Sequence, residues 1–229
     1  MAILIAILLV AVLLWLTLRR LSPAFATRFA LWREQCEVEQ SKRDAIRGVD
    51  DLLAFQQLLY ERGKPQLEPI AREALDQIGF KSTSREIIPG PNFEIDGRTT
   101  FGSSPGILEI KGSKKQIVLD ELSVFIPKVL ADFDAKGYRS KGILVGNGLC
   151  DARPKDRLGE KVFSSHTLQA AKAHSIALVN SVDLYCIVCG VLSGQIKTQD
   201  LEHMREKILH TNGFVSLLEY CKGLPFTDS

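Results

Sequence analysis

The sequence predicts an α/β sandwich with a mixed central sheet, preceded by a transmembrane helix and a helical stalk. Residues 2–18 form an apolar run that two arginines follow directly. Residues 21–62 combine dense charge with apolar positions at rough helical spacing. Residues 66–191 show the order helix, short strands, helix, strand, helix, strand, which is typical of helices that cover a sheet.

The N-terminal run, AILIAILLVAVLLWLTL, contains no charged residue. At about 1.5 Å per residue it reaches roughly 26 Å, close to the thickness of a hydrocarbon core. A cleaved signal peptide is the alternative, because residues 24–26 (AFA) resemble a small-x-small cleavage site. However, no basic residue precedes the run, and Arg19 and Arg20 separate it from that site. We therefore expect an uncleaved membrane anchor.

Charge predicts the orientation of this single-pass anchor. Basic side chains follow the run and none precedes it, so the positive-inside bias places the N-terminus outside and the main domain in the cytoplasm. The five cysteines have irregular spacing, which agrees with free thiols in a reducing compartment. The net charge of +2 creates no global basic field that would indicate nucleic acid.

The chain is expected to divide into four segments. These are the anchor (residues 1–20), the helical stalk (residues 21–64), the α/β domain (residues 65–200) and a C-terminal helical extension (residues 201–229). The stalk helices either lift the domain off the membrane or pack onto it. They are also the candidate surface for self-association or for a protein partner.

Within the domain, residues 66–78 are expected to form a helix that ends at Gly79. Strands are expected over residues 80–88, 92–95, 107–110, 142–145 and 176–179. Asp96-Gly97 is a hairpin signal. Further helices are expected over residues 118–133, kinked or starting late because of Pro127, and over residues 163–173 and 203–209. Residues 184–191 are either a strand or a buried helix, since their apolar run has no clear period.

One segment, residues 92–116, carries a chemical pattern. Glu109 and Lys111 are two residues apart on a predicted strand, so their side chains share one face, while Leu108 and Ile110 point into the core. A charged pair on an apolar strand is costly unless it faces solvent or a site. The pair is therefore either a solvated surface ion pair or part of a functional site.

This strand, E-x-K after a helix and a hairpin and before a helix and the strand GILV, resembles the PD-(D/E)xK superfamily of restriction-endonuclease-like nucleases. The resemblance extends more weakly over residues 66–191. It implies a restriction-endonuclease-like fold and hydrolysis of DNA phosphodiester bonds. It also implies a Mg²⁺ ion held by an Asp and by Glu109, with Lys111 as the catalytic lysine that positions or activates the attacking water.

The sequence departs from the family pattern where the Asp is expected, because it reads Pro91-Asn92 there. Asn92 offers a neutral carbonyl oxygen, which is a weaker Mg²⁺ ligand than a carboxylate. Two residues are candidates to replace the Asp: Glu94, on the same strand face, and Asp96, 13 residues before Glu109. If none of them reaches the metal, the domain is a catalytically inactive nuclease fold that acts as a binding module or scaffold at the membrane.

Two basic clusters follow this site and are expected to contact DNA phosphates, which would make binding salt-sensitive. Their members are Lys114, Lys115 and Gln116, and then Arg153, Lys155 and Arg157. Ordinary loop charge is the alternative, above all for the second cluster. Cys186 and Cys189 form a C-x-x-C pair without further ligands at zinc spacing, so we interpret them as buried thiols.

Overall fold

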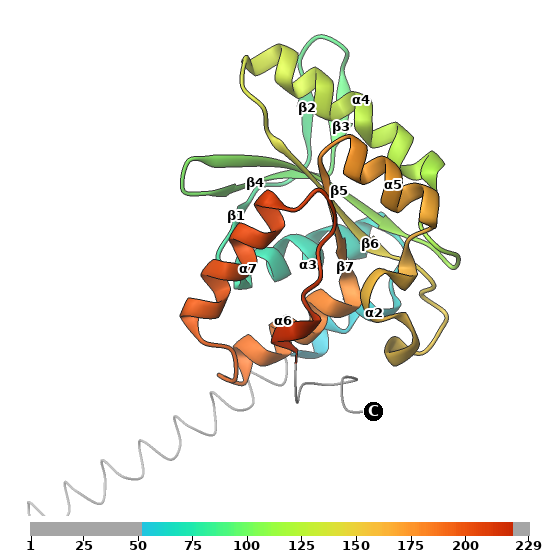
Figure 1. Ribbon diagram of the computed structural model, residues 1–229, viewed down its shortest axis with the longest axis vertical. Helices are drawn as coiled ribbons and strands as arrows, with labels where there is room; N and C mark the ends of the chain where they lie inside the picture. Colours follow the sequence, from blue (N-terminus) through green and yellow to red (C-terminus); the bar gives the residue numbers. More distant parts are fainter. Residues whose placement is uncertain (1–51, 222–229) are drawn as a thin grey trace, which may run out of the picture. The chain divides into compact units, whose positions relative to one another are not determined.

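A six-stranded mixed sheet with the strand order β1-β4-β5-β6-β7-β8 lies at the centre of the domain. The computed structural model describes residues 52–221 (Figure 1). The pairs β1–β4 and β4–β5 are antiparallel, whereas β5 to β8 run parallel to one another. The strands are β1 (Lys81–Ser82), β4 (Gly97–Phe101), β5 (Ser104–Gly112), β6 (Lys141–Asn147), β7 (Ile176–Asn180) and β8 (Gly213–Phe214). The predicted α/β class with a mixed sheet is confirmed.

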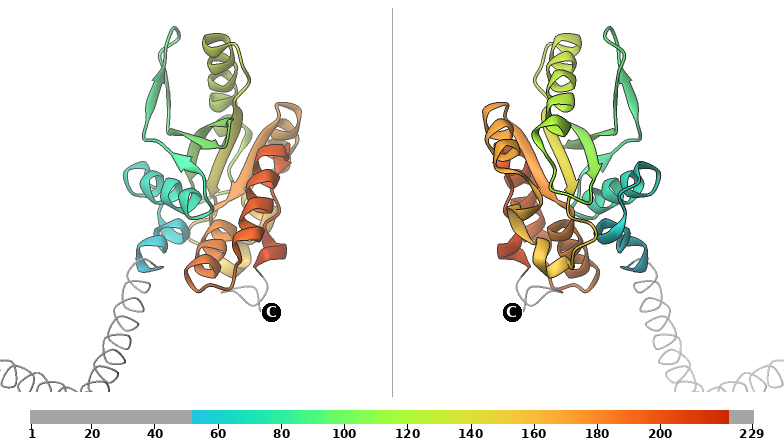
Figure 2. Two further views of the ribbon diagram at one scale, coloured as in Figure 1. Left: turned by 90° about the vertical axis from the view of Figure 1, so that its left-hand side faces the viewer. Right: turned by 90° about the vertical axis from the view of Figure 1, so that its right-hand side faces the viewer.

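Helices cover both faces of this sheet (Figure 2). One face carries α2 (Gln57–Tyr60), α3 (Lys64–Gln77), α6 (Ser181–Leu192) and α7 (Thr198–His210). The other face carries α4 (Leu119–Lys136) and α5 (Ser165–Ala173). The described residues also include short 3-10 helices, which are η1 (Pro154–Arg157), η2 (Gly159–Val162) and η3 (Leu218–Tyr220). Leu108 and Ile110 lie in the first core and Ile107 in the second, as the period of two along a strand requires.

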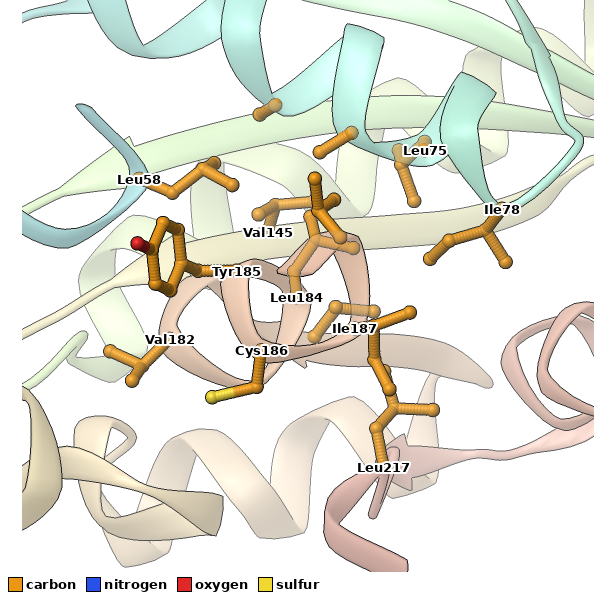
Figure 3. Close-up of a cluster of buried hydrophobic side chains, with 14 of the residues drawn as sticks. Leu58, Leu75, Ile78, Val145, Val182, Leu184, Tyr185, Cys186, Ile187 and Leu217 are labelled. Atoms are coloured by element: carbon orange, nitrogen blue, oxygen red, sulfur yellow. The ribbon is translucent and has the colours of Figure 1, made fainter. Parts of the chain in front are cut away.

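Helix α6 is buried almost all round. Figure 3 shows its side chains packed between Leu58 of α2, Leu75 of α3 and Leu217, which follows β8. A helix buried on every side needs no polar stripe, which explains why the sequence of residues 184–191 has no clear period. The choice left open between strand and helix is therefore settled as a helix. Cys186 and Cys189 are both buried in it.

Both ends of the described chain contribute to the domain core. Phe55, Leu58 and Leu59, from the predicted stalk, are buried beside α3 and α6. This part of the stalk thus packs onto the domain, which was the second of its two alternatives. Met204 and Ile208 of α7 belong to the same core, so much of the expected C-terminal extension is part of the domain.

The predicted anchor, residues 1–20, lies outside the described residues. Between residues 52 and 221, no helix combines the length and the apolar character needed to cross a membrane.

A separate two-stranded hairpin lies beside α4 (Figures 1 and 2). It consists of β2 (Glu86–Ile88) and β3 (Phe93–Ile95). The expected hairpin turn at Asp96-Gly97 is wrong, because the chain passes there from β3 into β4 and Asp96 is only 1% exposed. Glycine at position 97 allows the backbone of Thr83 to approach closely, since a Cβ atom on Gly97 would lie 2.4 Å from the Thr83 carbonyl oxygen.

Two other expected elements are also adjusted. The single strand expected over residues 80–88 is interrupted and forms β1 and β2, which belong to different sheets. Pro127 lies inside α4, which extends from Leu119 to Lys136 and therefore does not start late.

Candidate active site

Glu109 is a fully buried carboxylate on the central strand β5, with 0% of its surface exposed. Its Oε2 accepts a hydrogen bond from Lys128 Nζ of α4 at 2.6 Å. Its Oε1 lies 2.6 Å from Lys111 Nζ and 3.9 Å from Lys64 Nζ of α3. Three ammonium groups from three elements thus supply the counter-charge that a buried carboxylate requires.

The prediction that Glu109 and Lys111 share one face of the strand is confirmed by this 2.6 Å contact. The alternative of a solvated surface pair is wrong for Glu109, because its carboxylate is buried between helix and sheet. Lys111 differs from it, since 19% of its side chain is exposed. The pair therefore joins a buried acid to an amine that solvent reaches.

Asp96 lies next to Glu109 across the β4–β5 pair. Its backbone N–H donates to Leu108 O at 3.1 Å, and its Oδ2 accepts from Ile110 N at 2.8 Å. Because β4 begins only at Gly97, this carboxylate binds a β5 amide that β4 does not reach. The other oxygen, Oδ1, accepts from Lys64 Nζ at 2.8 Å. One ammonium group therefore faces both Asp96 and Glu109.

The other two candidates for the second acidic position lie elsewhere. Asn92 is exposed in the β2–β3 turn, where its backbone is left-handed with φ 55°. Glu94 is exposed on β3 and accepts a hydrogen bond from Arg85 at 3.1 Å. Of the three candidates, Asp96 is the one whose carboxylate contacts the same lysine as Glu109.

Sequence reasoning missed three charged residues of this cluster: Lys64, Glu68 and Lys128. Glu68 is 2% exposed and lies 3.7 Å from Lys64 Nζ, while Arg85 donates to both of its oxygens. A signal for two of them was present in the sequence. Glu68 shares the apolar face of α3 with residues 71 and 75, and Lys128 lies between the buried residues 125 and 129 of α4. A charged side chain on an otherwise apolar helix face indicates that a group of opposite charge is buried beside it.

Lys64 has a raised pKa. Desolvation by burial lowers the pKa of its ammonium, but the hydrogen bond to Asp96 and the charges of Asp96, Glu109 and Glu68 outweigh this effect. The ammonium is therefore held in its charged form by the carboxylates around it.

The segment before α3 places Lys64 at the end of β5. Asn147 Nδ2 donates to Glu61 O, and Arg157 donates to Leu59 O. The chain then crosses directly over Gly112, where a Cβ atom would lie 2.3 Å from Arg62 Cα. Glycine at the end of β5 is thus required for this crossing, because any larger residue would push the segment away.

Magnesium, which the family resemblance implies, can be compared with these donors. Over residues 52–221, no three His, Cys, Asp or Glu side chains form a group that would hold a metal ion in the present arrangement. Mg²⁺ is commonly held by one or two carboxylates together with water and substrate phosphates. Asp96 and Glu109 fit such a site if the ion takes the position of the Lys64 ammonium.

The two basic clusters lie side by side beyond β5 and β6. Leu149 N donates to Lys115 O, and Cys150 N donates to Ser113 O, so the two loops are hydrogen-bonded to each other. Five of the six predicted phosphate contacts are exposed: Lys114, Lys115, Gln116, Arg153 and Lys155. Lys114 pairs with Asp151 at 2.8 Å, and Arg153 pairs with Asp156 at the same distance.

Arg157 is the exception, because its side chain is fully buried. Its guanidinium donates to Asn147 Oδ1 at 2.8 Å and to Gly148 O at 3.3 Å, in addition to Leu59 O. The expectation that Arg157 contacts a phosphate is thus corrected: its donors bind the protein's own oxygens.

The cluster as a whole combines two buried acids facing one cation with a partly exposed lysine on the same carboxylate. Oxygen ligands of this kind suit a hard divalent ion, and ammonium groups beside them suit a phosphate. The chain matches no protein-family model, and no curated protein or solved structure is significantly similar to it.

Proposed function

We propose that the domain is a Mg²⁺-dependent nuclease with a restriction-endonuclease-like fold that hydrolyses DNA phosphodiester bonds. One observation carries this proposal: Asp96, just before β4, and Glu109, on β5, face a single cation position, and Lys111 pairs with the same Glu109. The order of elements around β5 agrees with the resemblance of its E-x-K strand to that superfamily.

In this proposal each charged residue has a separate role. Asp96 and Glu109 would hold the metal, which as a Lewis acid would stabilise the charge that develops on the phosphate. Lys111, partly exposed, would orient the attacking water. Lys128 binds Glu109 Oε2 from the far side, which keeps Oε1 turned towards Lys64 and Lys111. Lys128 is thus a positioning residue in this scheme.

The exposed basic loops would contact the DNA backbone. Residues 113–116 and 147–155 meet at the carboxyl ends of β5 and β6, the same end of β5 at which Lys111 lies. Phosphate contacts of this kind position a duplex without reading its sequence. We expect binding that weakens as salt rises.

The test is cleavage of plasmid and single-stranded DNA by the full-length chain in mild detergent with Mg²⁺. Asp96→Asn, Glu109→Gln and Lys111→Ala are each expected to reduce the rate by about 100-fold or more. Glu94→Gln is the matched control, because it neutralises an exposed acid of β3, two residues before Asp96, that pairs with Arg85. Equal rates in Glu109→Gln and the wild type would refute the proposal.

A non-catalytic binding module is the second candidate, and one observation favours it. Glu68, Asp96 and Glu109 are all paired with lysine or arginine, so the cluster is already charge-compensated without a metal. Folded protein that binds DNA but cleaves nothing with Mg²⁺ or Mn²⁺ would establish this reading.

The membrane location is a further part of the proposal. It rests on the apolar residues 2–18 and on the arginines that follow them. We expect the full chain to stay in the membrane fraction after alkaline carbonate extraction, and a chain lacking residues 2–18 to be released. Protease added to intact cells should leave the domain uncut, since it is expected in the cytoplasm. Release of the full chain by carbonate would exclude an integral anchor.

A further inference from the structure

The Lys64 ammonium lies where three carboxylates from different parts of the chain converge. Its Nζ is 2.8 Å from Asp96 Oδ1, 3.7 Å from Glu68 Oε1 and 3.9 Å from Glu109 Oε1. Glu109 Oε1 is buried and faces two ammonium groups, with Lys111 Nζ at 2.6 Å and Lys64 Nζ at 3.9 Å. Lys64 therefore occupies a position from which one cation faces both Asp96 and Glu109.

Lys64 differs from the two other lysines of the cluster. Lys111 and Lys128 each pair with Glu109, whereas Lys64 bridges Glu109 and Asp96. The Lys64 side chain is 42% exposed, compared with 11% for Lys128. Lys64 is the first residue of α3, and a flexible four-carbon stem carries its ammonium group. Its ammonium can therefore leave for solvent without repacking the core.

We propose that Lys64 is a built-in competitor of the metal: its ammonium occupies the cation position between Asp96 and Glu109 and is displaced into solvent when a divalent ion binds. This inference rests on the proposed metal-dependent function. An ion in contact with Asp96 Oδ1 and Glu109 Oε1 would lie beside Lys64 Nζ, and like charges at such a distance repel strongly in a partly buried site.

Two consequences follow from this competition. Without metal, Lys64 reduces the repulsion among the three carboxylates, so it stabilises the metal-free domain. With metal, part of the binding free energy is used to displace the ammonium, so Lys64 weakens the affinity. Removing the ammonium should therefore lower the stability of the metal-free domain and raise its affinity for the metal. Removing a lysine with a purely structural role would lower the stability without raising the affinity.

The first experiment titrates the full-length chain with Mn²⁺ and follows free Mn²⁺ by electron paramagnetic resonance. Lys64→Met is compared with Lys81→Met, which removes an exposed lysine of β1. We expect Lys64→Met to bind Mn²⁺ about tenfold more tightly than the wild type, equivalent to about 1.4 kcal/mol. Its melting temperature without metal should fall, and Mn²⁺ should restore it. Lys81→Met should match the wild type in both measurements.

The second experiment measures displacement directly. The wild-type chain is acetylated with an N-hydroxysuccinimide ester, with and without Mg²⁺, and the rate at Lys64 is read by mass spectrometry. An amine released from its carboxylate partners reacts faster, so we expect Mg²⁺ to accelerate labelling of Lys64 severalfold and to leave Lys81 unchanged.

The outcomes separate this inference from the proposed function. If the wild type binds Mn²⁺ and Lys64→Met binds it no more tightly, or if Mg²⁺ leaves labelling of Lys64 unchanged, Lys64 is not a competitor and the metal site stands. If neither the wild type nor Lys64→Met binds Mn²⁺ at millimolar concentration, the metal-dependent function fails, and the inference fails with it.

Discussion

Lys128 Nζ, from the middle of α4, lies 2.6 Å from Glu109 Oε2 on the central strand β5. Only 11% of the Lys128 side chain and none of the Glu109 side chain is exposed. A helix on one face of the sheet thus fixes one carboxylate oxygen of Glu109, while residues of β5 and α3 contact the other. The buried pair couples the packing of α4 to the orientation of the Glu109 carboxylate.

This coupling predicts non-additive stabilities. Glu109→Gln leaves Lys128 buried without its charged partner and should lower the free energy of unfolding by about 3 kcal/mol. The double variant Glu109→Gln/Lys128→Met should be more stable than the sum of the single effects predicts, by about 1 kcal/mol or more. Urea unfolding of the wild type and the three variants measures this coupling. Additive effects would show that the two residues do not depend on each other.

Gly112 is predicted to be intolerant of any side chain. A Cβ atom there would lie 2.3 Å from Arg62 Cα and 2.7 Å from Arg62 O, and backbone atoms cannot move aside as a flexible side chain can. Gly112→Ala should lower the free energy of unfolding by about 2 kcal/mol and abolish cleavage, because it displaces the segment that places Lys64. Gly63→Ala is the matched control, since its nearest contact is the flexible end of Gln66 and its φ is −75°. Equal losses in both variants would contradict this account.

Asp183 is predicted to make stability depend on pH. Its carboxyl is buried at the start of α6, and desolvation raises its pKa to about 7 although Gly159 N donates to Oδ1. Between about pH 4 and pH 7 the unfolded chain loses this proton while the folded domain keeps it, so stability falls as the pH rises through that window. Above pH 7 this contribution no longer changes.

Asp183→Asn mimics the neutral carboxyl and should remove this dependence. From pH 5 to pH 8, the stability of the wild type should fall by about 2 to 3 kcal/mol relative to that of the variant. Urea unfolding at the two pH values measures the difference. Asp134→Asn, at an exposed position of α4, should leave the wild-type dependence unchanged. A constant difference between Asp183→Asn and the wild type at both pH values would exclude Asp183 as the titrating group.

Arg157 is predicted to be structural. Its guanidinium binds oxygens of Leu59, Asn147 and Gly148, and burial lowers its pKa. Arg157→Met leaves these oxygens unpaired and should destabilise the domain by about 3 kcal/mol or more. Arg157→Lys should not restore stability, because one ammonium cannot reproduce the planar fork. Urea unfolding measures these effects, and Arg153→Met, at a position 73% exposed, should change the free energy of unfolding by less than about 1 kcal/mol.

Local patterns in the sequence were sufficient for several features of this protein. The class of fold follows from alternating helical and strand-like segments, and the shared face of Glu109 and Lys111 follows from the period of two along a strand. The spacing of Asp96 from Glu109 indicates Asp96 as a replacement for Asn92, although the hairpin turn expected at Asp96-Gly97 is a passage from β3 to β4. These features depend on the period within one segment or on the order and spacing of segments along the chain, which the sequence contains directly.

Other features depend on which segments meet. Lys64, Glu68 and Lys128 join the cluster because α3 and α4 pack on opposite sides of β5, and Lys64 and Lys128 lie 32 and 19 residues away from the carboxylates to which they donate. Arg157 is buried where its guanidinium meets the carbonyl oxygen of Leu59, 98 residues away, in addition to that of the nearby Gly148. The charge of a lysine or arginine is evident from the sequence, but its partner and its exposure are set by long-range packing. The reason is that burying an ionic group costs free energy unless tertiary contacts bring an opposite charge or a hydrogen-bond acceptor to it.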